Sequence, residues 1–206
     1  MNELDTDQGF WDIYDDAFIR EEREPRSVIR GLVNSADALV YSFRKDGVTV
    51  GICTVELLKS LSCGFIVYLA VSRSIRGSGV GSGMLKCVLS PESYCAAEIG
   101  IPERFILEVE HPDYASDERQ RIIREKRIHF FSRASLNPLF QGYLQPPLSP
   151  GFPVLPMVLL SSGGWKITPE AAVHAVYREK YHRVNGISSA VLEDLYFRSL
   201  GIRTSF

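Results

Sequence analysis

Alternation of apolar and polar residues predicts strands in several parts of the chain. The clearest case is Arg104 to Glu110 (RFILEVE), in which every second residue falls on the same face. Strands are predicted at Ala38 to Arg44, Val48 to Glu56, Phe65 to Val71, Arg104 to Glu110 and Pro156 to Leu160, with a further short strand at Leu57 to Leu61. Lys45-Asp46-Gly47 separates the first two runs and predicts a hairpin turn, because Asp and Gly tolerate positive φ.

Apolar residues at helical spacing predict the helices. They are expected at Phe10 to Phe18, Ser27 to Val33, Val80 to Leu89, Arg119 to Ala134, Thr168 to about His182, and from Ser188 or Ser189 to Gly201. Pro91 is expected to stop the third of these helices. In the Thr168 helix, Val173, Val176, Tyr177 and Tyr181 share one face. The charge run Arg20 to Arg26 is interpreted as a solvated turn.

Composition adds little that is specific. The chain has 206 residues, of which 45% are hydrophobic and 23% charged, so it can bury a sizeable core. A net charge of −2 favours neither nucleic acid nor a membrane as a partner. There is no apolar run of about 20 residues and no signal-peptide pattern, so we expect a cytoplasmic protein. The cysteines (Cys53, Cys63, Cys87 and Cys95) lie singly without a CxxC pair, so we expect reduced thiols and no metal.

The stretch from Phe65 to Leu89 carries the strongest chemical signal. A buried strand leads into Arg76-Gly77-Ser78-Gly79-Val80-Gly81-Ser82-Gly83, and a helix begins within this run. Glycines at a helix N-terminus let backbone N–H groups point at one anion, and the helix dipole adds positive potential. Arg76 supplies a cation suited to bidentate phosphate contact. The stretch predicts a phosphate or pyrophosphate site; the alternative is an ordinary tight turn with a surface arginine.

Spacing narrows the type of phosphate site. No glycine is followed by the Lys-Ser/Thr pair of a P-loop. The dinucleotide pattern GxGxxG also fails, since its third glycine position is Ser82 or Met84. The pattern that remains is R-x-x-G-x-G, filled by Arg76, Gly79 and Gly81.

Two carboxylates mark the strand Arg104 to Glu110. Glu108 and Glu110 fall on one face, close in sequence to the glycine loop, and such a pair suits general-base work. The alternative is a strand face that is exposed to water or paired with the basic helix that follows. That helix, Arg119 to Ala134, is expected to present mainly a solvated face.

The loop R-x-x-G-x-G, with "LAV" before it, resembles the acyl-CoA pyrophosphate loop of the GNAT acyltransferase superfamily. "RIHFFSRASL" (Arg127 to Leu136) resembles a second family motif, and "GYLQPPL…PMVLL" resembles the ending of a bacterial subset of uncharacterised members. The resemblance covers about Phe10 to Leu160. It implies an α/β (α+β) fold with a mixed central sheet of about six to seven strands flanked by helices. We expect residues 1–164 to form this domain and 165–206 a C-terminal helical extension packed on it, as a dimer arm or a substrate lid.

The resemblance also implies a reaction and its residues. Acetyl-CoA would be the cosubstrate, and an amine of a small molecule or peptide would attack its thioester directly. The expected acetyl-CoA contacts are Leu69, Ala70 and Val71 along the pantetheine arm and Arg76, Gly77, Ser78, Gly79, Val80, Gly81 and Ser82 at the pyrophosphate. Glu110 is the first choice of base and Glu108 the second.

The chain departs from the family at one position. The tyrosine usually offered as the acid to the leaving thiolate corresponds to Phe131. Tyr143, Tyr114 or Tyr68 would substitute, the thiolate would leave unassisted, or the protein is a non-catalytic acyl-CoA-binding sensor. A third hypothesis, a nucleic-acid-associated protein using the basic helix, is opposed by the net charge. We therefore expect an amine substrate, no nucleic acid, no membrane, and leave a homodimer open.

Overall fold

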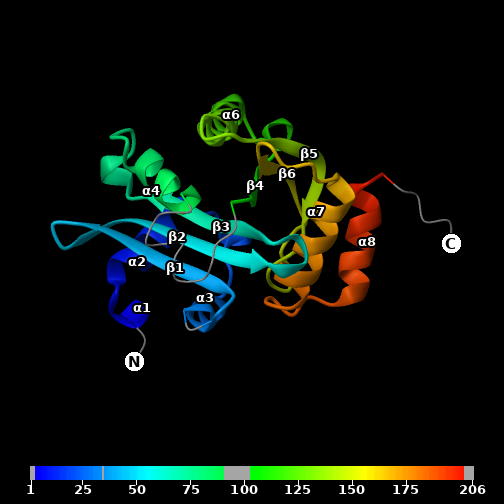
Figure 1. Cartoon of the computed structure of the whole chain (residues 1–206), viewed down its shortest axis with the longest axis horizontal. Helices are drawn as coiled ribbons and strands as arrows, with labels where there is room; N and C mark the ends of the chain where they lie inside the picture. The colour runs from blue at the N-terminus through cyan, green and yellow to red at the C-terminus, as the bar shows by residue number, and fades with distance from the viewer. Residues whose placement is uncertain (1–2, 34, 91–102, 202–206) are drawn as a thin grey trace. The chain divides into compact units, whose positions relative to one another are not determined.

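The computed structural model describes residues 3–33, 35–90 and 103–201. Pro91 and Cys95, to which the sequence assigned a helix stop and a thiol, lie outside the described residues. The chain divides into two compact units: Met1–Leu57 with Cys63–Glu103, and Leu58–Ser62 with Arg104–Phe206. Each unit has its own strands and helices (Figure 1).

The first unit combines a three-strand segment with helices. Its elements are α1 (Glu3–Thr6), α2 (Gln8–Ala17), η1 (Arg20–Glu22), α3 (Arg26–Leu32), β1 (Ala38–Lys45), β2 (Val48–Leu58), β3 (Cys63–Val71), η3 (Arg73–Ile75) and α4 (Val80–Leu89). β1 and β2 pair antiparallel through a turn in which Asp46 and Gly47 have φ of 50° and 78°, which confirms the predicted hairpin. Figure 1 shows α4 on one side of these strands and α1 to α3 on the other.

Aromatic residues of α2 form much of the core of the first unit. Phe10, Trp11 and Tyr14 are buried, as the helical spacing predicts. The Tyr14 ring meets the ring of Tyr68 on β3 edge to face, with centroids 4.9 Å apart. Such aromatic pairs add to the stabilisation from buried area, so they hold α2 firmly against β3.

Asp7 ties α2 to the β1–β2 hairpin. Its carboxylate caps the helix by accepting from the Phe10 N–H (3.0 Å) and also accepts from the hydroxyls of Ser42 (2.6 Å) and Thr49 (2.9 Å). Arg44 pairs with it at 3.1 Å. Burial raises the pKa of Asp7, but the hydrogen bonds from Ser42, Phe10, Thr49 and Arg44 outweigh burial and bring the pKa below its ordinary value.

We expect Asp7→Asn to lower the free energy of unfolding at pH 7 by about 2 kcal/mol. Because the folded pKa lies below the unfolded one, this stabilisation is present above about pH 4 and is lost as the pH falls through the folded value. Urea unfolding at pH 7 and at pH 3 measures both effects. Asp12→Asn, on the exposed side of the same helix, should change stability by less than about 0.5 kcal/mol. An Asp7→Asn protein as stable as wild type at pH 7 would contradict the assignment.

The second unit is built on three antiparallel strands. Its elements are η2 (Lys59–Leu61), β4 (Phe105–Glu110), η4 (Pro112–Tyr114), α6 (Glu118–Ser132), β5 (Leu136–Gln145), β6 (Leu155–Ser162), α7 (Pro169–Ala175), the π-helix η5 (Val176–His182) and α8 (Ser189–Ser199). β6 lies between β4 and β5 and pairs antiparallel with each. The helix α6 packs on β4 and β5.

The helices that follow residue 164 belong to this second unit. α7 and α8 pack on β5, as Figure 1 also shows. Both helices begin where predicted and are capped by side chains, since Thr168 accepts from the Ala171 N–H and Ser188 from the Val191 N–H. The domain division predicted from the sequence, at 164 and 165, remains a prediction.

The predicted fold class is confirmed, and two local expectations are corrected. The described residues contain six strands with helices packed on them, which lies within the predicted six to seven. The predicted short strand at 57–61 is wrong, because β2 continues to Leu58 and the helical turn η2 follows. The charge run from Arg20 is not fully solvated, because Glu24 is buried and its backbone N–H donates to the Tyr68 hydroxyl (3.0 Å).

Candidate functional site

The predicted glycine loop is an exposed turn that leads into α4. Gly77 and Gly79 have φ of 83° and 87°, the left-handed region that favours glycine. Gly79 is the N-cap of α4, and no side chain caps this helix end. Its first N–H groups are therefore available to a ligand, with the positive end of the helix dipole behind them. A Cβ placed on Gly77 or Gly79 would meet no atom within 4 Å, so the turn has open space beside it.

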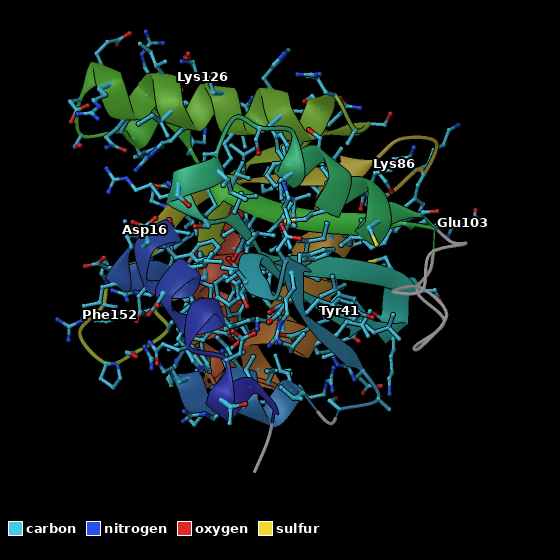
Figure 2. The ribbon with its side chains drawn as sticks, turned by 90° about the vertical axis from the view of Figure 1, so that its left-hand side faces the viewer. Asp16, Tyr41, Lys86, Glu103, Lys126 and Phe152 are labelled. Atoms are coloured by element: carbon cyan, nitrogen blue, oxygen red, sulfur yellow. The ribbon has the colours of Figure 1, made fainter. Side chains whose placement is uncertain are left out.

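Arg76 is held in place by two contacts. Its Nη2 donates to Asp16 Oδ2 on α2 (2.8 Å), and its Nε donates to the Val71 carbonyl (3.1 Å). Arg73 lies 3.8 Å from the same aspartate. The Arg76 side chain nevertheless keeps 47% of its surface exposed, so its remaining donors can reach a ligand. Figure 2 labels Asp16 on α2 and Lys86 on α4 in this unit.

The residues predicted to contact the pantetheine arm are the last three of β3. Leu69 and Val71 are half-buried, and Ala70 is buried. All the predicted acetyl-CoA contacts, from Leu69 to Ser82, thus lie in the first unit within one continuous strand, turn and helix. The candidate catalytic residues, Glu108, Glu110 and Tyr143, all lie in the second unit.

Glu110 is paired with arginines of α6. Arg124 Nη2 lies 3.0 Å from Glu110 Oε1, and Arg127 Nη1 pairs with Oε2. The Glu110 side chain is 13% exposed. Arg124 also donates to the His111 carbonyl at 2.8 Å, which fixes its position. The pairing with the basic helix, which the sequence offered as the alternative for this strand, is observed for Glu110, and the catalytic role of Glu110 stays a prediction.

Glu108, two residues earlier, has a different environment. Its Oε1 accepts a hydrogen bond from the Tyr181 hydroxyl at 2.5 Å. Tyr143 and Tyr177 lie close by, with their ring centroids 5.7 Å apart. We call Tyr143, Tyr177 and Tyr181 the tyrosine cluster; all three are buried.

Two members of the tyrosine cluster, Tyr143 and Tyr177, keep their protons at neutral pH because their pKa values are raised. Burial raises the pKa of Tyr143 well above its ordinary value, and the negative charge of Glu108 raises it further. Burial also raises the pKa of Tyr177, despite the hydrogen bond with Ser199. Sequence reasoning predicted Tyr143 but assigned Tyr177 and Tyr181 no role. Their spacing of four residues on one helix face was the available signal.

The other tyrosines considered as acids lie elsewhere. Tyr68 is buried in the first unit, where burial and then the charge of Glu24 raise its pKa. Tyr114 is 65% exposed, and its ring meets His111. Phe131 is buried against Phe130 and has no hydroxyl to offer.

The basic helix α6 combines paired and solvated residues. Arg121 pairs with Glu118 and Glu125 on the helix surface, and Lys126, labelled in Figure 2, is exposed. The predicted solvated face is confirmed for these residues. Arg124 and Arg127 differ, because both pair with Glu110.

The described part of the chain shows neither a metal-ligand cluster nor a membrane-spanning helix. Among residues 3–33, 35–90 and 103–201, no three His, Cys, Asp or Glu side chains gather as metal ligands would. Over the same residues, no helix has both the length and the apolar character required to span a bilayer.

These features define an α/β protein with a glycine-rich turn between a strand and the uncapped start of a helix. Residues 6–119, more than half of the chain, match the acetyltransferase (GNAT) family, and the chain therefore belongs to this family, as its motifs predicted. Membership supports the predicted general reaction, acyl transfer. No curated protein matches the chain significantly.

Solved structures agree on the fold. A putative GNAT acetyltransferase from Bacteroides thetaiotaomicron is 19% identical, with a TM-score of 0.69 over 90% of this chain and 95% of that one. The aminoglycoside 6'-N-acetyltransferase from Enterococcus faecium is 10% identical, with a TM-score of 0.52 over 78% of this chain and 92% of that one. At sequence identities of 19% and 10%, the similarity establishes a shared fold.

Proposed function

We propose that the protein is an N-acetyltransferase that moves an acetyl group from acetyl-CoA to an amine of a small molecule or peptide. The observation that carries this proposal is the exposed glycine turn before α4, in a chain of the GNAT family. An arginine and an uncapped helix N-terminus lie together there, which suits a pyrophosphate. Acetyl-CoA supplies the activated acetyl thioester when it is bound.

The residues of the turn fit a phosphate group. Open space beside Gly77 and Gly79 allows close approach to the backbone, and Arg76 is already oriented by Asp16. We assign Arg76 to Ser82 to the pyrophosphate and the backbone of Leu69 to Val71 to the pantetheine arm.

The proposal of a base rests on the contacts of the two carboxylates, Glu108 and Glu110. An ammonium acceptor must lose a proton before it attacks, so a group able to accept this proton is required. Proton uptake by Glu110 would disrupt its pairs with Arg124 and Arg127. Glu108 accepts a hydrogen bond from the Tyr181 hydroxyl. We therefore assign the base to Glu108 ahead of Glu110, which reverses the preference derived from the sequence.

Tyr143 supports Glu108 in this proposal. It is fully buried, and its raised pKa keeps the proton on its hydroxyl. We propose that Tyr143 lines the environment of the Glu108 carboxylate and does not act as an acid. The CoA thiolate then leaves without receiving a proton from a tyrosine. Departure of an unprotonated thiolate is reasonable, because a thiol has a pKa of only about 8.5 and its thiolate is therefore a good leaving group near neutral pH.

The buried Phe131 favours one alternative, a sensor that binds acetyl-CoA without turnover. Both functions predict binding of acetyl-CoA, and they differ in thiol release. An amine panel with thiol detection separates them, because a sensor releases no CoA with any acceptor.

We expect calorimetric titration to show micromolar binding of acetyl-CoA, weakened about tenfold or more by Arg76→Ala. The loss follows from removing a bidentate donor to phosphate. Arg73→Ala is the matched control, because Arg73 is 82% exposed and should change the affinity less than threefold. Equal affinities of the Arg76→Ala and wild-type proteins would remove the pyrophosphate assignment. Absence of binding to the wild-type protein would overturn the proposed function.

A further inference from the structure

The helices after residue 164 contain a π-helix, an uncommon element. In η5 and just beyond it, the Arg183 N–H donates to the Arg178 carbonyl and the Asn185 N–H to the Lys180 carbonyl, each five residues earlier. π-Helical turns are rare and are found frequently at functional sites. This one carries both Tyr177 and Tyr181, the residues of the tyrosine cluster that the sequence did not single out.

Glu179 anchors η5 to the helical turn η2. Its carboxylate accepts from the backbone N–H groups of Lys59 (2.6 Å) and Ser60 (3.1 Å) and from the Ser60 hydroxyl, all within the second unit. Contacts of a carboxylate with adjacent N–H groups fix both its position and its direction. The rotation of η5 about its axis is therefore set by Glu179.

The two tyrosines of η5 have different partners. The Tyr177 hydroxyl donates to the Leu144 carbonyl at 2.5 Å and lies 3.1 Å from Ser199 Oγ. The Tyr181 hydroxyl donates to Glu108 Oε1 at 2.5 Å. Only a few per cent of either side chain is exposed, so these bonds form away from bulk water, where they are strong.

We propose that Tyr181 is a positioning residue for acetyl transfer, and that it orients Glu108 and stabilises its ionised form. The inference rests on the proposed function, in which Glu108 is the base. It gives the C-terminal extension a part in the reaction: η5 supplies the donor, and Glu179 holds η5 in place.

Other ionisable groups near Tyr181 and Glu108 could also influence the protonation of Glu108. Tyr143 of β5 and Tyr177 of η5 face Glu108 and stay protonated near neutral pH. Lys180 is also buried in η5, and Arg198 of α8 lies near Tyr177. Glu110, on the same strand, is paired with Arg124 and Arg127. The control variant Tyr177→Phe leaves all these charges unchanged. A difference between Tyr181→Phe and Tyr177→Phe therefore reports the hydrogen bond from Tyr181 to Glu108.

The test is Tyr181→Phe, followed through the pH dependence of kcat with a responsive amine. Removing the donor disfavours the ionised carboxylate, so the acidic limb of the profile should move up by about one pH unit. At pH values well below the midpoint of the limb, kcat should fall about tenfold, and KM for acetyl-CoA should change less than twofold. Tyr177→Phe should leave the acidic limb in place. A limb that does not move in Tyr181→Phe, or that moves equally in both variants, would overturn the proposal.

A second replacement keeps the test decisive if Tyr181→Phe does not fold. 3-Fluorotyrosine at position 181 retains the ring and the hydrogen bond but donates more strongly. The acidic limb should then move to lower pH, and an unmoved limb would reject the role of Tyr181.

Glu108→Gln separates failure of this inference from failure of the proposed function. Full activity of Glu108→Gln would show that Glu108 is not the base and would remove the ground for Tyr181 as well. Loss of activity in Glu108→Gln together with an unmoved limb in Tyr181→Phe would reject the positioning role alone.

Discussion

Glu108→Gln is expected to lower kcat by about 10²- to 10⁴-fold and to change the affinity for acetyl-CoA less than threefold. Glutamine has the shape of glutamate and can still accept from Tyr181, but its amide cannot take a proton from the amine. Steady-state thiol release measures kcat, and calorimetry measures the affinity. The loss should be largest at pH values above the acidic limb, where Glu108 of the wild-type protein is ionised and can act as base.

Glu110→Gln provides the matched comparison. It leaves Arg124 and Arg127 without a carboxylate partner, so we expect a loss of about 1–3 kcal/mol in the free energy of unfolding. Its kcat should stay within about threefold of wild type. The opposite result, with turnover lost in Glu110→Gln and kept in Glu108→Gln, would restore the order predicted from the sequence.

Gly142→Val is expected to lower the free energy of unfolding by about 3 kcal/mol. A Cβ at Gly142 on β5 would lie 2.7 Å from the Ser199 carbonyl oxygen and 2.7 Å from Phe140 Cζ. The backbone oxygen of α8 cannot turn away as a side chain can, so α8 must shift from β5. Thermal and urea unfolding measure the loss.

Gly31→Ala is the control for adding a side chain at a glycine. A Cβ at Gly31, on the exposed side of α3, would meet no atom within 4 Å. Alanine favours a helix over glycine, so this variant should gain about 0.5–1 kcal/mol. A Gly142→Val protein as stable as wild type would show that α8 does not depend on this close approach.

Local patterns predicted most of the elements. The alternation in RFILEVE, the Asp46-Gly47 turn and the glycine-led start of α4 all depend on neighbouring residues, and each corresponds to an observed element. The stretch just after Leu57 was harder to predict, because β2, η2 and β3 follow one another without a clear breaker. Propensity alone does not separate a strand from a short helical turn there.

Contacts between distant residues could not be predicted. The burial of Glu24 depends on Tyr14 and Tyr68, which lie 10 and 44 residues away. The distinction between Glu108 and Glu110 depends on the arginines of α6 and on Tyr181, 73 residues beyond Glu108. Alternation places both carboxylates on one strand face, but only the packing of helices decides which partner each one meets.

The tyrosine cluster brings together residues that are synthesised at different times. Glu108 and Tyr143 emerge from the ribosome before Tyr177 and Tyr181 have been translated. A nascent chain that ends before residue 181 contains the carboxylate without its phenol donor, and one that ends before residue 179 leaves η2 without its anchor. Such a chain also lacks α8, which packs on β5 in the folded unit, and incompletely packed intermediates are prone to aggregation. Completion of the second unit therefore waits for residues that are translated well after β4 and β5.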